Sequence, residues 1–226
     1  MKVAKQSVEL IDYCGDDISV VNAARVSFNK QSEFDYDYGM DGLTNLRLTE
    51  KDAKLINYLA KHKHKSPFNH CFMSFRVKAP IFVARQLVKH EYLPWNEVSR
   101  RYVIDEPEFY CPEYWRKAAD NVKQGSSDEE VKFITSPARV ATAQCLSAYN
   151  TMLDAGVCAE QARMVLPQNS MTEWIWSGTL FAFAKMCKLR LDAHTQRETQ
   201  EIAQLVSKHA EFLYPVSWKA LMEYGE

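Results

Sequence analysis

The sequence predicts a single α+β domain over residues 1–226, with a small mixed or antiparallel sheet and a helix-rich C-terminal half. Residues 7–14 and 70–80 alternate apolar and polar side chains, which is the period of a half-buried strand. From residue 137 onward the apolar side chains recur at helical spacing instead. Neither a repeat nor a long linker divides the chain, and 226 residues can build one sizeable core.

A strand and a helix open the chain. The strand at 7–14 ends at Gly15, and a helix over 16–28 follows with Asp16 or Asp17 as its N-cap. The apolar face of this helix holds Val20, Val21 and Ala24.

The next segment, 29–48, mixes acids, amides and tyrosines without any period. We expect a long surface loop there, which could serve as a lid. Thr49 then begins a helix over 50–62, and Asp52 stands where a short-armed capping box needs its partner.

The strand at 70–80 leads into a helix over 80–91, and Pro80 suits the first turn of that helix. One face of the strand holds Cys71, Met73, Phe75 and Val77, and the other holds Ser74, Arg76 and Lys78. A loop rich in proline and aromatic residues follows over 107–115, and 120–130, which includes "GSSDEE", is expected to be a flexible tip. The remaining helices are expected over 137–155, 158–166, 173–191 and 195–213.

The composition excludes several classes of protein. A net charge of −1 argues against a general nucleic-acid binder, which would carry a basic excess. No run of residues approaches the about 20 apolar positions of a membrane span. Six dispersed cysteines and a first segment without an apolar core predict a reduced, cytoplasmic protein.

A first polar cluster, "KHKHKSPFNH", holds three histidines and three lysines. His62 and His64 have the spacing of a zinc pair, with His70 nearby, but no further residue completes a metal site, so no metal is expected. A solvated basic turn and a binding loop remain the other interpretations. The lysines at 61, 63 and 65 would attract an anion.

A second cluster, "KHEYLPWNEVSRRY", lies between two apolar stretches at 89–102. In a helix, Gln86, Lys89 and His90 would share one face. If 97–101 is extended, a carboxylate, a hydroxyl and a guanidinium point the same way, from Glu97, Ser99 and Arg101. Such a set can bind a planar polar ligand that carries a phosphate. The alternative is a solvated turn flanked by ion pairs.

Two further clusters lie in the C-terminal half. Arg163 stands in the otherwise apolar "EQARMVLPQN", where a surface arginine is the usual interpretation. The segment "CKLRLDAHTQRETQE" crowds polar and charged side chains at a helix junction, where helix capping by Asp192 plus surface charge is the alternative. They are Arg190, Asp192, His194, Gln196 and Glu198. No glycine-rich phosphate loop, nucleophile elbow or activated cysteine is present.

Taken together, these segments resemble the flavin-dependent thymidylate synthase family. Its signature, Arg-His-Arg, seven residues and Ser-x-Arg-Tyr, stands here as Lys89-His90-Glu91 followed by Ser99-Arg100-Arg101-Tyr102. The blocks "AARVSF", "HKSPFNH", "VKAPIFVARQ", "EQARMVLP" and "LRLDAHTQRE" follow in family order, so the resemblance covers about residues 8–210.

The resemblance implies a homotetrameric α+β enzyme with FAD and its active sites at subunit interfaces. It implies methylation of dUMP to dTMP, with methylenetetrahydrofolate as carbon donor and NADPH as reductant, and with no nucleic-acid or membrane partner. The family uses no cysteine nucleophile on the uracil ring, in keeping with the lack of an activated cysteine here.

The resemblance also assigns residues. Arg190 is similar to the arginine that polarises the uracil, and is the expected catalytic residue. The expected dUMP-binding residues are Gln86, Lys89, Glu97, Val98, Ser99, Arg100, Arg101, Arg163 and Arg190. The expected FAD-binding residues are His64, Ser66, Lys89, His90, Glu91 and Glu97.

This sequence departs from the family pattern mainly on the flavin side. Lys89 and Glu91 replace the two arginines of the signature, Asn69 stands where a glutamate is common, and Thr179 and Phe181 replace an Asn and an Arg of some members. Two alternatives follow: an enzyme that transfers another group, such as hydroxymethyl, or an inactive relative that binds nucleotide or a partner.

Overall fold

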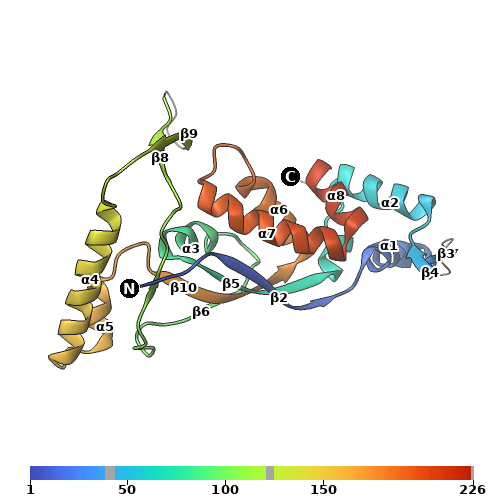
Figure 1. The fold of residues 1–226 in the computed structure, drawn as a ribbon. Helices are drawn as coiled ribbons and strands as arrows, with labels where there is room; N and C mark the ends of the chain where they lie inside the picture. Colours follow the sequence, from blue (N-terminus) through green and yellow to red (C-terminus); the bar gives the residue numbers. More distant parts are fainter. Residues whose placement is uncertain (39–43, 121–124, 225–226) are drawn as a thin grey trace.

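The computed structural model describes residues 1–38, 44–120 and 125–224. At its centre lies a four-stranded antiparallel sheet, so the predicted α+β class is confirmed (Figure 1). Its strands in spatial order are β2 (Ser7–Cys14), β5 (Phe72–Pro80), β10 (Met171–Thr179) and β6 (Trp95–Glu97).

One face of this sheet is covered by helices and the other is polar. Met73, Phe75 and Val77 of β5 are fully buried beneath the helices, as their alternation predicts. On the opposite face, Arg76 binds Glu173 at 2.9 Å, an exposed pair across β5 and β10. The alternation therefore decides which side of the sheet receives the helices.

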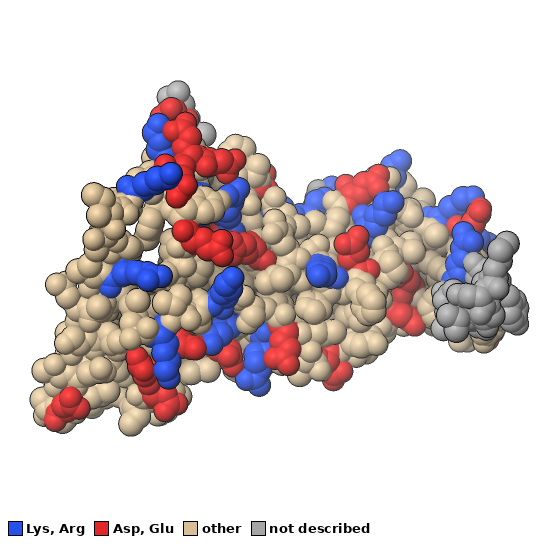
Figure 2. Space-filling view, in the orientation of Figure 1, with Lys and Arg blue, Asp and Glu red and all other residues tan. Residues whose placement is uncertain are grey.

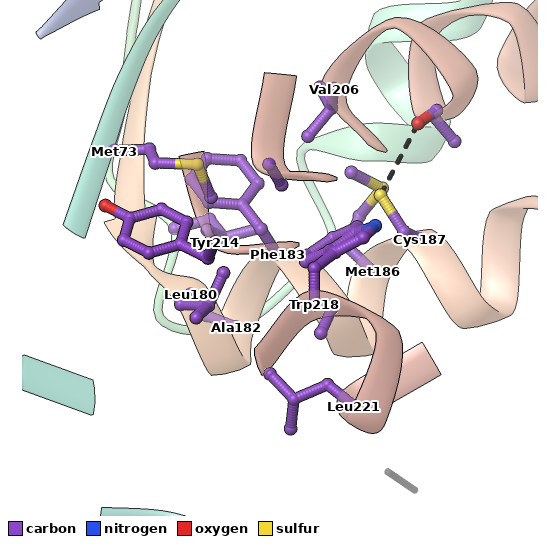
Figure 3. Packing of buried hydrophobic residues seen from close by; sticks show 14 of the residues in the cluster. Met73, Leu180, Ala182, Phe183, Met186, Cys187, Val206, Tyr214, Trp218 and Leu221 are labelled. Atoms are coloured by element: carbon purple, nitrogen blue, oxygen red, sulfur yellow. Dashed lines mark hydrogen bonds between the residues drawn. The ribbon is translucent and has the colours of Figure 1, made fainter. Parts of the chain in front are cut away.

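The covering helices are α3 (Ile81–Leu87), α6 (Leu180–Arg190) and α7 (Arg197–Leu213), which lie together over the sheet in Figure 1. Figure 3 shows the core beneath them, where side chains of α6 meet Met73 from β5 and Trp218 from the C-terminal helix. The Cys187 thiol is buried there and donates to the Ala203 carbonyl at 3.5 Å. Burial raises the pKa of this thiol, in keeping with a packing role.

A second group of helices lies at the other end of the sheet and comprises α1 (Asp17–Arg25), α2 (Glu50–Lys61) and α8 (Pro215–Tyr224). Their starts are capped as the sequence predicts: Asp16 accepts from Ser19 N, and Thr49 accepts from Asp52 N. Buried Asp17 accepts from the Val216 and Ser217 amides at 2.9 and 2.8 Å, which ties α1 to α8.

The third part is an arm beside the sheet, at the left of Figure 1. It comprises β1 (Lys2–Val3), β7 (Glu108–Phe109), β8 (Trp115–Ala118), β9 (Ser126–Val131), α4 (Pro137–Asp154), α5 (Ala159–Ala162) and the 3₁₀ helix η3 (Arg163–Val165). Its small core is separate from the main one and contains Phe109, Leu146, Tyr149 and Ala162.

The main correction concerns 173–191, which the sequence predicts as one helix. Its first part is instead β10, a central strand, and only 180–190 is helical. Trp174 and Trp176 are buried on one face at period two, and Gly178 leaves room for Leu93 on the same side. A short apolar run buried in a sheet carries few polar positions, so its period is hard to distinguish from that of a helix.

Several boundaries also differ. The helix predicted over 80–91 ends at Leu87, and that over 158–166 is only a short α-helix followed by a 3₁₀ turn. Helix α8 has no counterpart in the sequence prediction, which stops at 213.

The two predicted loops contain strands. Within 29–48, β3 (Asp35–Tyr38) pairs with β4 (Thr44–Arg47), although residues 39–43 between them are not described. Within 120–130, β9 pairs with β8, and residues 121–124 lie outside the described part. All four strands are short, and most of their residues are polar or aromatic, so the sequence alone does not indicate a strand there.

No helix in the described ranges is both long and apolar enough to cross a lipid bilayer.

Candidate active site

Arg190, the predicted catalytic residue, ends α6 and is held by two neighbours from the end of α3. Its Nη2 donates to the Gln86 carbonyl and its Nε donates to His90 Nε2, both at 2.9 Å. Nη1 has no hydrogen bond to any residue that the structure describes. The guanidinium is therefore fixed on one edge and leaves one nitrogen for a ligand.

His90 must be neutral to accept from Arg190. Burial first, and then the charges of Arg190 and Lys185, lower its pKa to about 4 from an ordinary 6.5. Nε2 thus stays an acceptor at neutral pH and orients the guanidinium. The resemblance places His90 at the flavin, whereas within one chain its ring contacts Arg190.

A series of hydrogen-bonded side chains holds the Gln86 side chain in place. Gln86 Nε2 donates to Gln196 Oε1 at 2.6 Å, and Gln196 Nε2 donates to Glu198 at 3.0 Å. Glu198 in turn accepts both bonds from Arg116 of β8, at 2.9 and 3.0 Å. The buried Arg116–Glu198 pair is thereby connected to Gln86, a predicted substrate residue. No motif in the sequence indicates this role for Arg116.

The segment after β6 is a turn rather than the predicted extended run. Tyr102 N and Val103 N both donate to the Ser99 carbonyl, at 3.0 and 3.1 Å, and Arg101 N donates to the Ser99 hydroxyl at 3.3 Å. Glu97, Ser99 and Arg101 therefore do not share one strand face. The extended prediction fails because the local side-chain-to-backbone bonds of Ser99 favour a turn.

Trp95, unexpected in so polar a segment, anchors this turn to the sheet. Its ring stacks on Trp174 with centroids 4.1 Å apart. Its Nε1 donates to one Glu97 oxygen at 3.0 Å, and the Thr172 hydroxyl donates to the other at 2.6 Å. The Glu97 carboxylate is thus held in position from both sides.

A cavity of about 480 Å³ gathers part of the predicted dUMP set, namely Glu97, Val98, Arg100 and Arg163. The Arg163 side chain has no hydrogen-bond or ion-pair partner among the described residues and is available to an anion. Arg101 is directed elsewhere, because its Nε donates to Glu160 and its guanidinium lies 5.4 Å from the Tyr102 ring centroid.

The predicted flavin residues are dispersed. His64 and Ser66 line a separate cavity of about 830 Å³ beside α1 and α2. Lys89 and Glu91, which follow α3, are exposed. Asn69 and Thr179, two of the residues that differ from the family pattern, are in contact: the Thr179 hydroxyl donates to Asn69 Oδ1 at 2.8 Å.

One chain therefore holds the predicted site residues in separate places: the Arg190 cluster, the Arg163 cavity and the cavity at His64. The sequence resemblance names these residues as parts of one site, and within the described chain they are not brought together. Gln196 and Thr172 contact predicted site residues. The sequence places Gln196 in a polar cluster without giving it a site role, and it gives no signal for Thr172.

The three histidines of the first cluster do not converge. The Tyr58 ring lies 4.2 Å from the His62 ring and 6.1 Å from the His64 ring, between centroids. Among the described residues, no three His, Cys, Asp or Glu side chains are grouped as metal ligands would be.

Comparisons with known proteins agree on one family. A family profile described as thymidylate synthase complementing protein matches residues 9–216. A flavin-dependent thymidylate synthase of Thermus thermophilus is 39% identical over 97% of this chain and 77% of its own length. Another, of Thermotoga neapolitana, is 36% identical over 98% of this chain and 93% of its length.

A solved structure is also similar over the full length. The UMP/dUMP methylase PolB from Streptomyces cacaoi, bound with 5-Br dUMP, has a TM-score of 0.82 at 29% identity. The match covers 100% of this chain and 98% of that one. Because the profile spans most of the sequence and both relatives share more than a third of its aligned residues, the chain belongs to the thymidylate synthase complementing protein family, the flavin-dependent thymidylate synthases.

Proposed function

We propose that this protein is a methyltransferase that converts dUMP to dTMP, with methylenetetrahydrofolate as carbon donor and NADPH as reductant through FAD. The family membership supports methylation of a uracil nucleotide, and the intact set Gln86, Glu97, Arg163 and Arg190 supports dUMP. The overall reaction balances: one methylene and one hydride become the new methyl group, which replaces the C5 hydrogen of the uracil. That hydrogen leaves as a proton, and tetrahydrofolate is released.

The observation that carries the proposal is the fixed guanidinium of Arg190. Two hydrogen bonds hold its Nε and Nη2, so that little reorganisation is needed when Nη1 donates to a uracil oxygen. A permanently charged donor favours the anion formed when the ring loses its N3 proton. Such pre-orientation stabilises the charge that develops on the ring during the reaction.

The nucleotide phosphate and ring have candidate binding partners in the Arg163 cavity, which lies apart from Arg190 within one chain. Arg163 is free to bind an anion, while Thr172 and Trp95 hold the Glu97 carboxylate as an acceptor for a ring N–H or a sugar hydroxyl. Arg101 would have to exchange Glu160 for the substrate phosphate. That exchange is feasible because both side chains are about half exposed and their pair is weak.

The residues present fit a flavin that bridges copies of the chain. His64 and Ser66 offer an aromatic ring and a hydroxyl at one cavity, and Lys89 offers an exposed cation elsewhere on the same chain. When bound, FAD would supply the two electrons that turn a methylene group into a methyl group. Exposed Glu91 would lie on the flavin side as well, where its negative charge would repel the negative phosphates of the cofactor.

We propose a homotetramer whose active sites lie between subunits. The support is the separation of the predicted residues within one chain, together with apolar side chains that the arm leaves exposed. Ile134 is fully exposed and Met164 is 76% exposed. Burying such a surface between copies of the chain would stabilise the assembly.

A cofactor-omission assay with labelled dUMP tests the function. We expect dTMP only when FAD, NADPH and methylenetetrahydrofolate are all present, and a yellow protein after FAD is added. A product heavier by one oxygen in the mass spectrum would instead indicate hydroxymethyl transfer. Binding of dUMP without turnover would identify an inactive relative.

A further inference from the structure

The cavity beside α1 and α2 differs in its charge from the other large cavities. We call it the lysine pocket and define it by Arg25, Lys30, Lys51, Lys54, Tyr58 and His64, which line its volume of about 830 Å³. None of its described lining residues is a carboxylate. By contrast, Glu113 and Glu201 line the cavity near the N-terminus, and Glu97 and Glu173 line the Arg163 cavity.

Most of this positive charge is not neutralised within the described chain. The exception is Arg25, which binds Asp52. Lys54 lies 3.8 Å from Glu50, but both side chains are more than 80% exposed, so the pair contributes little. Lys30 and Lys51 have no ion-pair partner among the described residues. The lysine pocket therefore favours an anion with more than one charge.

Aromatic surface accompanies these charges. Phe28, also in the lining, is 76% exposed and Tyr58 is 54% exposed, which is unusual for such large side chains. The Tyr58 and His64 rings are nearly parallel, with an interplanar angle of 20°. A planar group can stack on this surface while its charged end reaches the lysines.

We propose that the lysine pocket receives the aminobenzoyl-glutamate end of the folate substrate, with the glutamate carboxylates bound by Lys30, Lys51 and Lys54. This assignment rests on the proposed function, which makes a folate the carbon donor. The wall at His64 and Ser66 is shared with the expected flavin contacts, so a folate reacting beside the flavin could extend its tail into the pocket.

The diphosphate of FAD is a second anion that could bind these lysines. The geometry of the pocket favours the folate tail over this diphosphate. The long lysines of α2, together with Lys30 just after η1 (Val26–Phe28), surround an open cavity, which suits several carboxylates along a chain. A tightly held diphosphate more often meets arginine forks or backbone amides. Exposed lysines also bind weakly, as a substrate that leaves at every turnover requires.

The lysines that the sequence singles out are not the ones that line this pocket. Lys65 lies over the Phe181 ring, 5.4 Å from its centroid, and with Lys63 it lines a void of only about 10 Å³. Those in the pocket, Lys30, Lys51 and Lys54, come from two distant segments. The proposed anion site therefore lies beside α1 and α2, and not at the lysines of 61–65 that the sequence singles out.

The test compares methylenetetrahydrofolate bearing one or three glutamates. We expect the wild type to have a lower KM for the triglutamate, and Lys51→Gln/Lys54→Gln to raise that KM about fivefold, the combined effect of two exposed ion pairs. The KM for the monoglutamate should change much less. The matched control, Lys132→Gln/Lys208→Gln, removes the same charge from exposed lysines elsewhere and should keep the wild-type ratio.

Two further measurements separate the outcomes. A KM ratio that the pocket variant leaves unchanged overturns the tail site while dTMP formation upholds the proposed function. Weaker FAD binding with an unchanged ratio also overturns it, in favour of the cofactor diphosphate. If the wild type makes no dTMP, the proposed function fails, and equilibrium binding of pteroyl triglutamate to wild type and variant decides the pocket independently.

Discussion

At the scale of single residues, the proposed site depends on how Arg190 is held. An arginine is always charged, so its contribution comes from direction, and direction here is set by the Gln86 carbonyl and by neutral His90. The sequence resemblance predicts a role for Arg190, but it does not give the reason for the orientation of this side chain. His90 acts as an acceptor because its surroundings lower its pKa.

Replacing Arg190 by lysine tests whether the planar guanidinium with its several donors is needed. Arg190→Lys keeps the positive charge but loses two of the donor positions, so we expect kcat to fall by about a hundredfold. The KM for dUMP should change less than kcat. Arg85→Lys, an exposed arginine on α3, is the control and should retain wild-type kcat. Equal losses in both variants would contradict the assignment.

The pKa of His90 predicts a pH dependence of stability. Between pH 6.5 and about 4 the unfolded chain binds a proton at His90 that the folded chain excludes. The free energy of unfolding should therefore decrease as the pH falls through this window. His90→Gln should show a shallower decrease, measured by urea denaturation at fixed protein concentration. Parallel pH profiles for the two proteins would contradict the prediction.

At the scale of elements, α7 links the arm to the site. Its first turn carries Glu198, whose carboxylate binds Arg116 of β8 and also accepts from Gln196. Both charges are largely buried, with 15% and 6% of the two side chains exposed. A buried pair of this kind contributes little net stability, but losing one partner is costly.

Two variants at this pair separate stability from positioning. Arg116→Met leaves the Glu198 charge buried and unpaired, so we expect a loss of about 3–5 kcal/mol in unfolding free energy. Arg116→Met/Glu198→Leu removes both charges and should restore most of that stability. In both variants Gln196 is no longer held by the Arg116–Glu198 pair, so we expect each of them to raise the KM for dUMP. Recovery of both quantities together would show a structural role only.

At the scale of the whole molecule, the arm is the part least explained by one chain. Its core is small and separate, and Figure 2 shows that much of its visible face, at the left, carries no charge. Val140 on α4 and Met164 beside α5 are exposed apolar side chains. Such a surface is expected to be covered by another copy of the chain.

Light scattering coupled to gel filtration tests the assembly. We expect a mass of four chains of 26.1 kDa each. Val140→Lys/Met164→Lys should lower that mass because it places charge on an apolar contact. Ser147→Lys, on α4 as well, is a control for added charge on the helix. A wild-type mass of one chain would contradict the proposed interfaces.

The sequence by itself determined the α+β class, the capped helices α1 and α2, the strand β5 and the family. These depend on local caps, on a clear two-residue period or on ordered motifs. Only the tertiary structure decided that "MTEWIWSGT" is the strand between β5 and β6, because its burial depends on both neighbours. It also decided which lysines share a pocket and what holds Arg190, since these contacts join residues up to about a hundred positions apart, and no local pattern records them.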